Sequence, residues 1–255
     1  MPESLIELMP LAVPTSRRWL LAQGVSVSRL DNALKSGKFA ALGPGLYARP
    51  GLQVDWRGVV LALQREGTGA VVGGVSALEV LGKGHYLSLT ATKSLTVFAS
   101  GPPPAWLKYV SSIVTVDWQG TSRVWGGVAD LGQFMTQPYD WRTDVPALAV
   151  SRPERAVLEV LSLVPRRVSF ELADNLFQGL TSLSPSRVDQ ALRACSSVKA
   201  KRLFFLLVKR YGYSWTKRLA IENYDLGSGK RVIVEGGKLD PDFLITVPEA
   251  FYESR

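Results

Sequence analysis

The sequence predicts an α+β protein in which an N-terminal winged helix-turn-helix is followed by a larger mixed α/β domain with a small sheet and several helices. Three observations predict this fold. Two short segments of helical character, Ser16–Gln23 and Ser26–Ser36, are separated by a turn at Gly24. A glycine-containing hairpin pattern follows at residues 38–49. Beyond residue 55, strand-like apolar stretches are interspersed with segments of helical periodicity.

The composition favours a protein with anionic partners. The 255 residues include 30 Lys and Arg against 22 Asp and Glu, which gives a formal net charge of +8. Hydrophobic residues make up 46%, which is enough for two cores. The amino terminus lacks the basic start and long apolar run of a secretory signal, and the densest apolar run, Leu203–Val208, is too short for a bilayer. We therefore expect a cytoplasmic protein with no membrane contact.

The helix-turn-helix is predicted from its caps and its apolar spacing. Ser16 is a capping residue for the first helix, and Gly24 ends it. In the second helix, Val27, Leu30 and Leu34 fall at i, i+3 and i+7, so we expect them to pack inward. The outward face of that helix then carries Ser28, Arg29, Asn32 and Lys35.

The segments on either side of this motif define the first domain. We expect a short leading helix over residues 3–9, and Gly37 ends the second helix. Apolar and aromatic residues flank Gly43-Pro44-Gly45, as two short strands of a wing would. Residues 49–51 are predicted to be a linker. The predicted domains are therefore residues 1–52 and 53–255, with a subdomain edge near residues 100–104.

The first part of the larger domain is predicted to combine helices with strands. Helices are expected near Trp56–Arg65 and, after a glycine turn, at Gly73–Leu81. Strand-like stretches follow at Tyr86–Leu89, Leu95–Ala99, Ile113–Trp118 and Arg123–Gly127. Together they predict a small mixed sheet.

The second part of the larger domain is predicted to be mainly helical. Helix start and stop residues bound segments at Pro153–Leu163, Ser169–Gln178, Pro185–Ala194 and Lys199–Tyr211. The tail returns to strand at Lys230–Glu235 and Phe243–Val247.

The outward face of the second helix has the residue types that read DNA bases. Polar and basic side chains reach base edges from a helix in the major groove. The Arg29 guanidinium suits guanine and the Asn32 amide suits adenine, so we predict these two residues, with Ser28 beside them, for sequence readout. A helix-turn-helix that contacts only protein is the alternative. Phosphate contacts are predicted for Arg17, Arg18, Lys35, Lys38 and Arg49, and Tyr47 either contacts a phosphate or, as we prefer, fills the core under the wing.

A second basic segment lies near the C-terminus. Residues 199–218 hold seven basic residues and no acidic one, interleaved with apolar and aromatic residues that must be buried. The basic side is either solvated, in contact with an acidic partner, or in contact with DNA backbone. The residues assigned to this face are Lys199, Arg202, Lys209, Arg210, Lys217 and Arg218.

No catalytic motif is complete. The segment Gly227–Lys230 departs from the phosphate-binding loop at Tyr224 and Arg231. The segment Gly74–Leu78 resembles a nucleophile elbow but lacks its final glycine. Asp240 and Asp242 form the one acidic pair that is similar to a nuclease metal site, but no Glu-x-Lys or Asp-x-Lys follows them.

Metal and thiol chemistry are also not expected. With Cys195 and His85 as the sole cysteine and histidine, the chain cannot form an intrachain disulfide or an ordinary zinc site. We expect Cys195 to be a buried or half-buried spectator on a helix rather than a nucleophile, and His85 to be a structural polar residue. The sequence therefore predicts a protein that is not an enzyme and has no cofactor or metal.

Short motifs spread along the chain carry a family resemblance. They are Leu20–Ser26, Gly37, Gly45–Tyr47, Gly73–Glu79, Gly84–Leu87, Pro104–Leu107, Ser151–Ala156, Ser197–Leu203, Asp225–Arg231 and Gly236–Asp240. In this order the chain resembles, over nearly its whole length, the AbiEi-type antitoxins of bacterial type IV toxin-antitoxin systems, a group first associated with abortive phage infection.

The resemblance implies a repressor with two activities. Its winged helix would bind inverted repeats in its own promoter, and its C-terminal domain would counteract a nucleotidyltransferase-type toxin without a stable complex. One departure is visible, because Pro44 stands where such wings often carry a basic residue.

Two alternatives remain open. The first is a free-standing DNA-binding regulator whose C-terminal domain senses a ligand or a protein partner. The second is an enzyme that uses Asp240 and Asp242. In solution we expect a monomer, with pairing on double-stranded promoter DNA.

Overall fold

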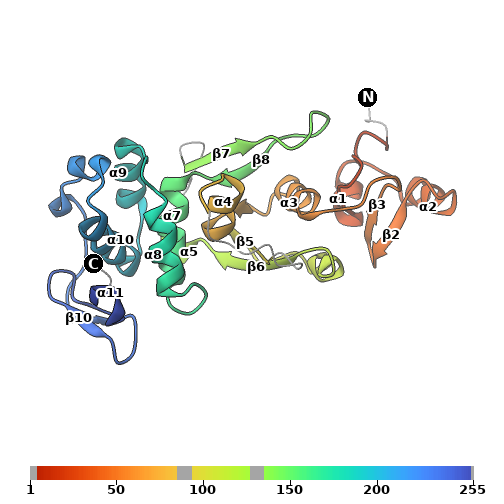
Figure 1. Ribbon diagram of the computed structural model, residues 1–255. Helices are drawn as coiled ribbons and strands as arrows, with labels where there is room; N and C mark the ends of the chain where they lie inside the picture. The colour runs from red at the N-terminus through yellow and green to blue at the C-terminus, as the bar shows by residue number, and fades with distance from the viewer. Residues whose placement is uncertain (1–4, 85–93, 127–134, 254–255) are drawn as a thin grey trace. The chain divides into compact units, whose positions relative to one another are not determined.

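The computed structural model describes residues 5–84, 94–126 and 135–253 (Figure 1). The chain divides into two compact units. Unit 1 comprises Met1–Val72, Leu89–Gly120 and Pro138–Val150, and unit 2 comprises Gly73–Ser88, Thr121–Gln137 and Ser151–Arg255. Helices and strands occur in both, which confirms the α+β class.

Unit 1 begins with the winged helix-turn-helix that the sequence predicts. Its elements are β1 (Thr15–Ser16), α1 (Arg17–Ala22), α2 (Val27–Lys35), β2 (Ala40–Gly43) and β3 (Leu46–Ala48), and the strands pair in the order β1-β3-β2. The predicted caps are present, because Ser16 Oγ accepts a hydrogen bond from Trp19 N at 3.1 Å and Ser26 Oγ accepts one from Arg29 N at 3.3 Å.

Two local predictions for this region are wrong. Val27 is 45% exposed, whereas Leu30 and Ala33 are buried. Val27 is exposed because it is only the first residue of α2, and Val25 in the preceding turn is buried in the core at that end of the helix.

The leading segment is not a helix, since residues 5–9 form turns. A segment this short gains little from its own hydrogen bonds. Its apolar side chains pack on the winged-helix core instead.

A mixed five-stranded sheet forms most of the rest of unit 1, and the outer ends of β7 and β8 extend into unit 2. The strands β4 (Val71–Val72), β5 (Ser94–Ala99), β6 (Thr115–Gly120), β7 (Thr136–Tyr139) and β8 (Leu148–Ser151) lie in the order β6-β5-β4-β8-β7. Strands β5 and β6 are parallel, as are β4 and β8, whereas β4 and β5 are antiparallel. Helix α3 (Trp56–Arg65) has the predicted bounds, and a 3-10 helix, η1 (Ala105–Val110), precedes β6.

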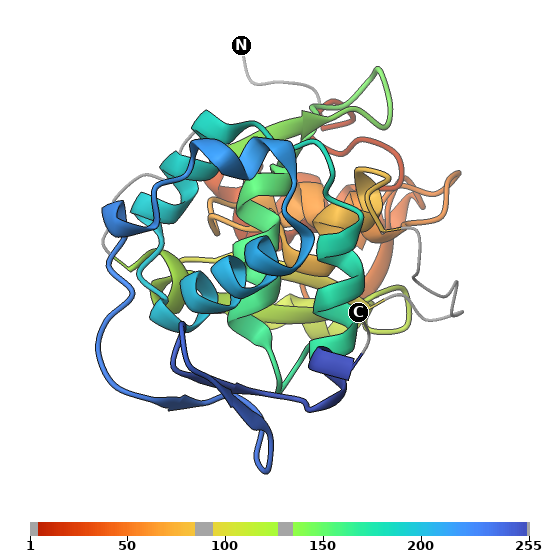
Figure 2. The same cartoon turned by 60° about the vertical axis from the view of Figure 1, so that its left-hand side comes forward.

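Unit 2 is mainly helical. Its helices are α4 (Gly74–Val80), α5 (Ser122–Trp125), α7 (Pro153–Leu163), α8 (Phe170–Gln178), α9 (Pro185–Ala194), α10 (Val198–Tyr211) and α11 (Ala250–Glu253), with 3-10 turns η2 (Ser214–Arg218) and η3 (Ile221–Asn223). Helix α7 packs against α8, α9 and α10, as Figure 2 shows. Within the described ranges, no helix is long and apolar enough to cross a bilayer.

Three strands complete unit 2. They are β9 (Arg231–Val232), β10 (Lys238–Asp240) and β11 (Ile245–Val247), in the order β10-β11-β9. The strand predicted over Lys230–Glu235 is therefore only two residues long.

The predicted strand at Arg123–Gly127 is wrong, because residues 122–125 form α5 and bury Val124 and Trp125. The strand predicted at Tyr86–Leu89 lies outside the described residues.

A buried carboxylate joins three helices of unit 2. Glu159 in α7 is fully buried, and its Oε2 accepts a hydrogen bond from Gly74 N, at the start of α4, at 2.9 Å. Its Oε1 accepts hydrogen bonds from Arg155 Nε at 2.6 Å and from Trp125 Nε1, in α5, at 3.3 Å. Since Arg155 is also buried, the ion pair is shielded from water and fixes α4 and α5 on α7.

Candidate nucleic-acid interface

Helix α2 presents a polar and basic face to solvent. Ser28, Arg29, Asn32 and Lys35 are all exposed on it. Within residues 5–84, 94–126 and 135–253, the structure shows no ion pair and no side-chain hydrogen bond for Arg29, Asn32 or Lys35. The base-reading and charged groups of this helix are therefore available to a ligand.

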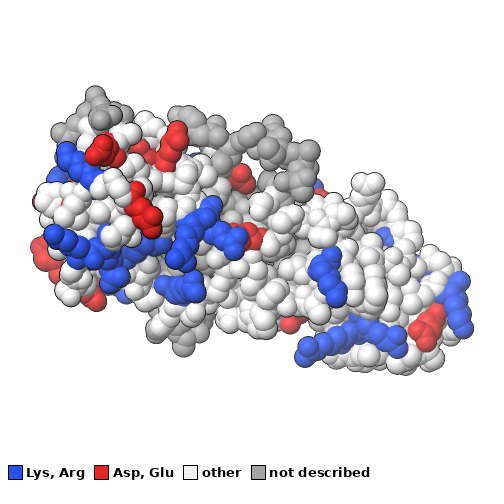
Figure 3. Space-filling model, turned by 90° about the horizontal axis from the view of Figure 1, so that it is seen from below, with Lys and Arg blue, Asp and Glu red and all other residues white. Residues whose placement is uncertain are grey.

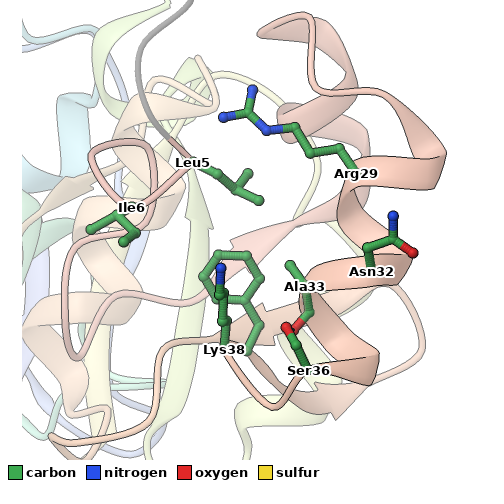
Figure 4. Close-up of a pocket in the computed structure, with 8 residues that line it drawn as sticks. Leu5, Ile6, Arg29, Asn32, Ala33, Ser36 and Lys38 are labelled. Carbon is green, nitrogen blue, oxygen red and sulfur yellow. The ribbon is translucent and has the colours of Figure 1, made fainter.

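The same face borders a hollow of about 480 Å³. Figure 4 shows the Arg29 side chain extending from α2 toward Leu5, while the Asn32 amide points away from Leu5 and Ile6. The hollow is lined by Leu5, Ile6, Arg29, Asn32, Ala33, Ser36, Lys38 and Phe39. Arg29 and Lys38 thus place two cations on one concavity, whose lining also includes the apolar residues Leu5, Ile6 and Phe39.

The other predicted DNA contacts differ in exposure. Arg18 and Lys38 are exposed, and Arg17 is half-buried. Arg49 is half-buried, and its Nη1 donates a hydrogen bond to the Met9 carbonyl oxygen at 3.5 Å. Tyr47 is only 6% exposed and packs in the winged-helix core, so it fills the core under the wing and is not part of the proposed DNA-binding surface.

Arg65 in α3 ties the winged helix to the rest of unit 1. Its Nη1 donates to the Leu8 carbonyl oxygen at 3.2 Å, and its Nη2 donates to the Pro14 carbonyl oxygen at 3.0 Å and to Thr15 Oγ1. The guanidinium lies 4.2 Å from the centroid of a Trp19 ring, and Trp19 Nε1 donates to the Arg65 carbonyl oxygen at 3.3 Å.

Burial lowers the pKa of Arg65 to about 10, which still leaves it charged at neutral pH. Sequence reasoning missed Arg65, because no local pattern connects position 65 with residues 8–19.

Most of the second basic face serves unit 2 itself. Arg202 is 2% exposed, and its guanidinium donates to the carbonyl oxygens of Leu226 and Gly229, both at 2.7 Å, and of Gly227 at 3.1 Å. Lys199 donates to the Val164 carbonyl oxygen. These two side chains therefore hold the fold, and we do not include them in a partner surface.

The remaining cations of that face fall into two groups. Lys209 pairs with Asp242, and Arg210 lies 3.7 Å from Asp174 and donates to the Phe251 carbonyl oxygen. Lys217 and Arg218 in η2 are exposed, and no partner for either side chain is present in the described part of the chain.

The residues considered for chemistry are occupied by structural contacts. Asp240 is buried; its Oδ1 accepts hydrogen bonds from Asp242 N at 3.0 Å and Phe243 N at 2.9 Å, and its Oδ2 accepts one from Tyr252 Oη at 2.8 Å. Among the residues that the structure describes, no group of three or more His, Cys, Asp or Glu is placed to hold a metal ion. Cys195 is buried at the C-terminal cap of α9, as expected of a spectator, and His85 lies outside the described residues.

Lysine and arginine side chains occur on the face shown in Figure 3. At the end of unit 1 that carries α2, mostly blue charged groups stand out among white side chains, and only limited red is visible. An excess of positive charge beside exposed polar groups on a helix suits a polyanion.

The winged helix-turn-helix and two family models together place the chain in the class of transcriptional regulators. A family model described as "Transcriptional regulator, AbiEi antitoxin N-terminal domain" matches residues 2–89, and one described as "Transcriptional regulator, AbiEi antitoxin, Type IV TA system" matches residues 92–248. The chain therefore belongs to the AbiEi family of regulators and antitoxins of type IV toxin-antitoxin systems, as its motifs indicated. This is not an enzyme family.

A solved structure shares the fold. The crystal structure of the RV2827C protein from Mycobacterium tuberculosis matches with a TM-score of 0.55 and 14% identity, over 91% of this chain and 85% of that one. Among curated proteins no match was found.

Proposed function

We propose that this chain represses its own operon by placing α2 in the major groove of inverted-repeat, double-stranded promoter DNA, and that it counteracts a nucleotidyltransferase-type toxin in the cytoplasm. Membership of the AbiEi family supports the general role of regulator and antitoxin. The observation that carries the DNA-binding part is the exposure of Arg29 and Asn32 on one helix without partners among the described residues.

The dimensions of α2 suit base readout. An α-helix with its side chains is about 10–12 Å across, which fits the width of the major groove of about 12 Å. Arg29 and Asn32 are three residues apart, so they are about 4.5 Å apart along the helix axis, near the spacing of neighbouring base pairs. We assign base contacts to these two residues and to Ser28, and phosphate contacts to Arg17, Arg18, Lys35, Lys38 and Arg49.

Promoter binding is tested with the full chain and a labelled fragment of its own promoter. We expect binding at least about 10³-fold tighter than to a scrambled duplex of the same length, and an affinity that falls as salt rises. Equal affinity for both duplexes at every salt concentration would reject sequence-specific repression. The mass of the protein measured with and without the duplex tests the expected change from monomer to a pair on DNA.

Toxin counteraction is tested by co-expression with a nucleotidyltransferase-type toxin encoded beside the chain. We expect rescue of growth, and weaker rescue by the double variant Lys217→Glu/Arg218→Glu, because these two exposed cations are the ones left free for an acidic partner in the described part of residues 199–218. Specific promoter binding without rescue would favour the free-standing regulator instead.

A further inference from the structure

The wing of this protein carries no charge of its own. Residues 40–48, which form β2, the turn and β3, contain neither Lys nor Arg. Pro44 lies at the turn between Gly43 and Gly45. The electrostatic part of the affinity of a hairpin for a DNA backbone comes from positive groups, so here these must come from neighbouring segments.

Arg17 lies on one side of the wing. Its backbone N–H donates a hydrogen bond to the Gly45 carbonyl oxygen at 2.8 Å, and its Cβ would lie 3.8 Å from a Cβ placed on Gly45. The first residue of α1 is thus fixed beside the turn of the wing.

The 3-10 helix η1 packs against the other strand of the wing, β2. A Cβ built on Gly43 would lie only 2.5 Å from Cγ of Tyr109, so the Tyr109 ring packs directly on the backbone of β2. Only glycine allows this approach. The Tyr109 ring occupies the space that a side chain on Gly43 would fill. Through this contact η1 and the wing pack together within unit 1.

Lys108 precedes Tyr109 and adds the second cation. Its side chain is exposed, and its ammonium nitrogen lies 5.1 Å from the centroid of the Tyr109 ring. In the described ranges of the chain, no carboxylate pairs with it. The ring that touches Gly43 therefore also positions an uncompensated positive charge next to β2.

We infer that Lys108 is a phosphate-contacting residue that supplies charge the wing lacks, so that the neutral wing meets DNA with two cations beside it, Arg17 at the turn and Lys108 next to β2. This inference rests on the proposed function. It extends the DNA-binding surface beyond residues 2–89, because Lys108 belongs to the segment matched by the second family model. A single lysine on a phosphate adds affinity and carries no sequence information.

The test compares full-length variants on the promoter duplex and on a scrambled duplex across a salt series. Lys108→Ala should weaken binding to both duplexes by the same factor, about 3- to 10-fold, and should reduce the slope of log affinity against log salt by about 0.9. Lys108→Arg should restore both. The matched control is Lys238→Ala, which removes an exposed lysine 5.2 Å from the Tyr252 ring in unit 2 and should leave the slope unchanged.

The outcomes separate this inference from the function on which it rests. If the wild-type protein binds its promoter and Lys108→Ala has the wild-type affinity and slope, the role of Lys108 is rejected and the proposed function stands. If the wild-type protein binds neither duplex, both are rejected. Circular dichroism of each variant tests whether the fold is retained. A loss of affinity confined to the promoter duplex would make Lys108 a base-reading residue and would contradict the inference.

Discussion

At the scale of single residues, base readout depends on the shape of two side chains of α2. Arg29 can donate two hydrogen bonds to one guanine, and Asn32 can pair with adenine through its amide. We expect Arg29→Ala and Asn32→Ala each to weaken binding to the promoter duplex by ~1–3 kcal/mol and to reduce its preference over scrambled DNA. Fluorescence anisotropy on both duplexes measures the two effects.

A conservative variant separates shape from charge at the same position. Arg29→Lys keeps the positive charge but loses the planar fork, so it should bind scrambled DNA like the wild type and still lose preference for the promoter. If the alanine variants lose the same factor on both duplexes, base readout lies elsewhere on the molecule.

Cys195 is a second residue whose behaviour follows from its surroundings. Burial raises the pKa of its thiol to about 11 from an ordinary value of 9.0. Since the folded-state pKa is raised, the thiol stays neutral up to higher pH than in the unfolded chain, and at pH 8 the thiolate fraction falls by about 100-fold. We expect iodoacetamide at pH 8 to modify the denatured chain readily and the native chain at least 100-fold more slowly; equal rates would contradict the buried position.

At the scale of elements, the sequence was informative where a structure is set by neighbouring residues. Capping serines and first-turn prolines predicted α1, α2, α7 and α9 closely, because the groups that end a helix lie within a few residues of it. The two-residue strand β4 and the strand β8 were missed, since their pairing of Val72 with Val150 joins distant parts of the chain. The contact of Tyr109 with Gly43 was missed for the same reason.

The ion pair in α7 permits a prediction about how helices are joined. Glu159→Ala would leave the buried Arg155 guanidinium without its counter-charge and would remove the acceptor for Gly74 N. We expect a loss of ~3–5 kcal/mol in the free energy of unfolding, measured by urea denaturation. The control is Arg193→Ala, which removes an exposed side chain and its i,i+4 pair with Asp189 and should cost less than ~1 kcal/mol. A loss at Glu159 no larger than at Arg193 would show that the buried pair does not join the helices.

At the scale of the whole molecule, the sequence and the contacts divide the chain differently. The linker pattern at residues 49–51 led us to place a first domain at 1–52, and the family models meet between residues 89 and 92. Unit 1, by contrast, collects three separate stretches of the chain. Glycine and proline mark places where the backbone turns, but they carry no information on which later segments return to pack beside it.

The contacts of Arg65 make the independence of the first 52 residues testable. A fragment of residues 1–52 lacks the guanidinium that binds the carbonyl oxygens of Leu8 and Pro14 and covers Trp19, and it also lacks the Tyr109 ring beside the wing. We expect this fragment to unfold without a cooperative transition and to lose promoter preference, because its small core exposes apolar surface that unit 1 covers.

Full-length Arg65→Lys is the matched control, because it keeps a positive charge but not the fork that joins several carbonyl groups. It should fold cooperatively with a lower midpoint of urea unfolding. A fragment that unfolds cooperatively and binds the promoter as tightly as the full chain would show that the winged helix is an independent domain, and that the contacts of Arg65 contribute nothing to its fold.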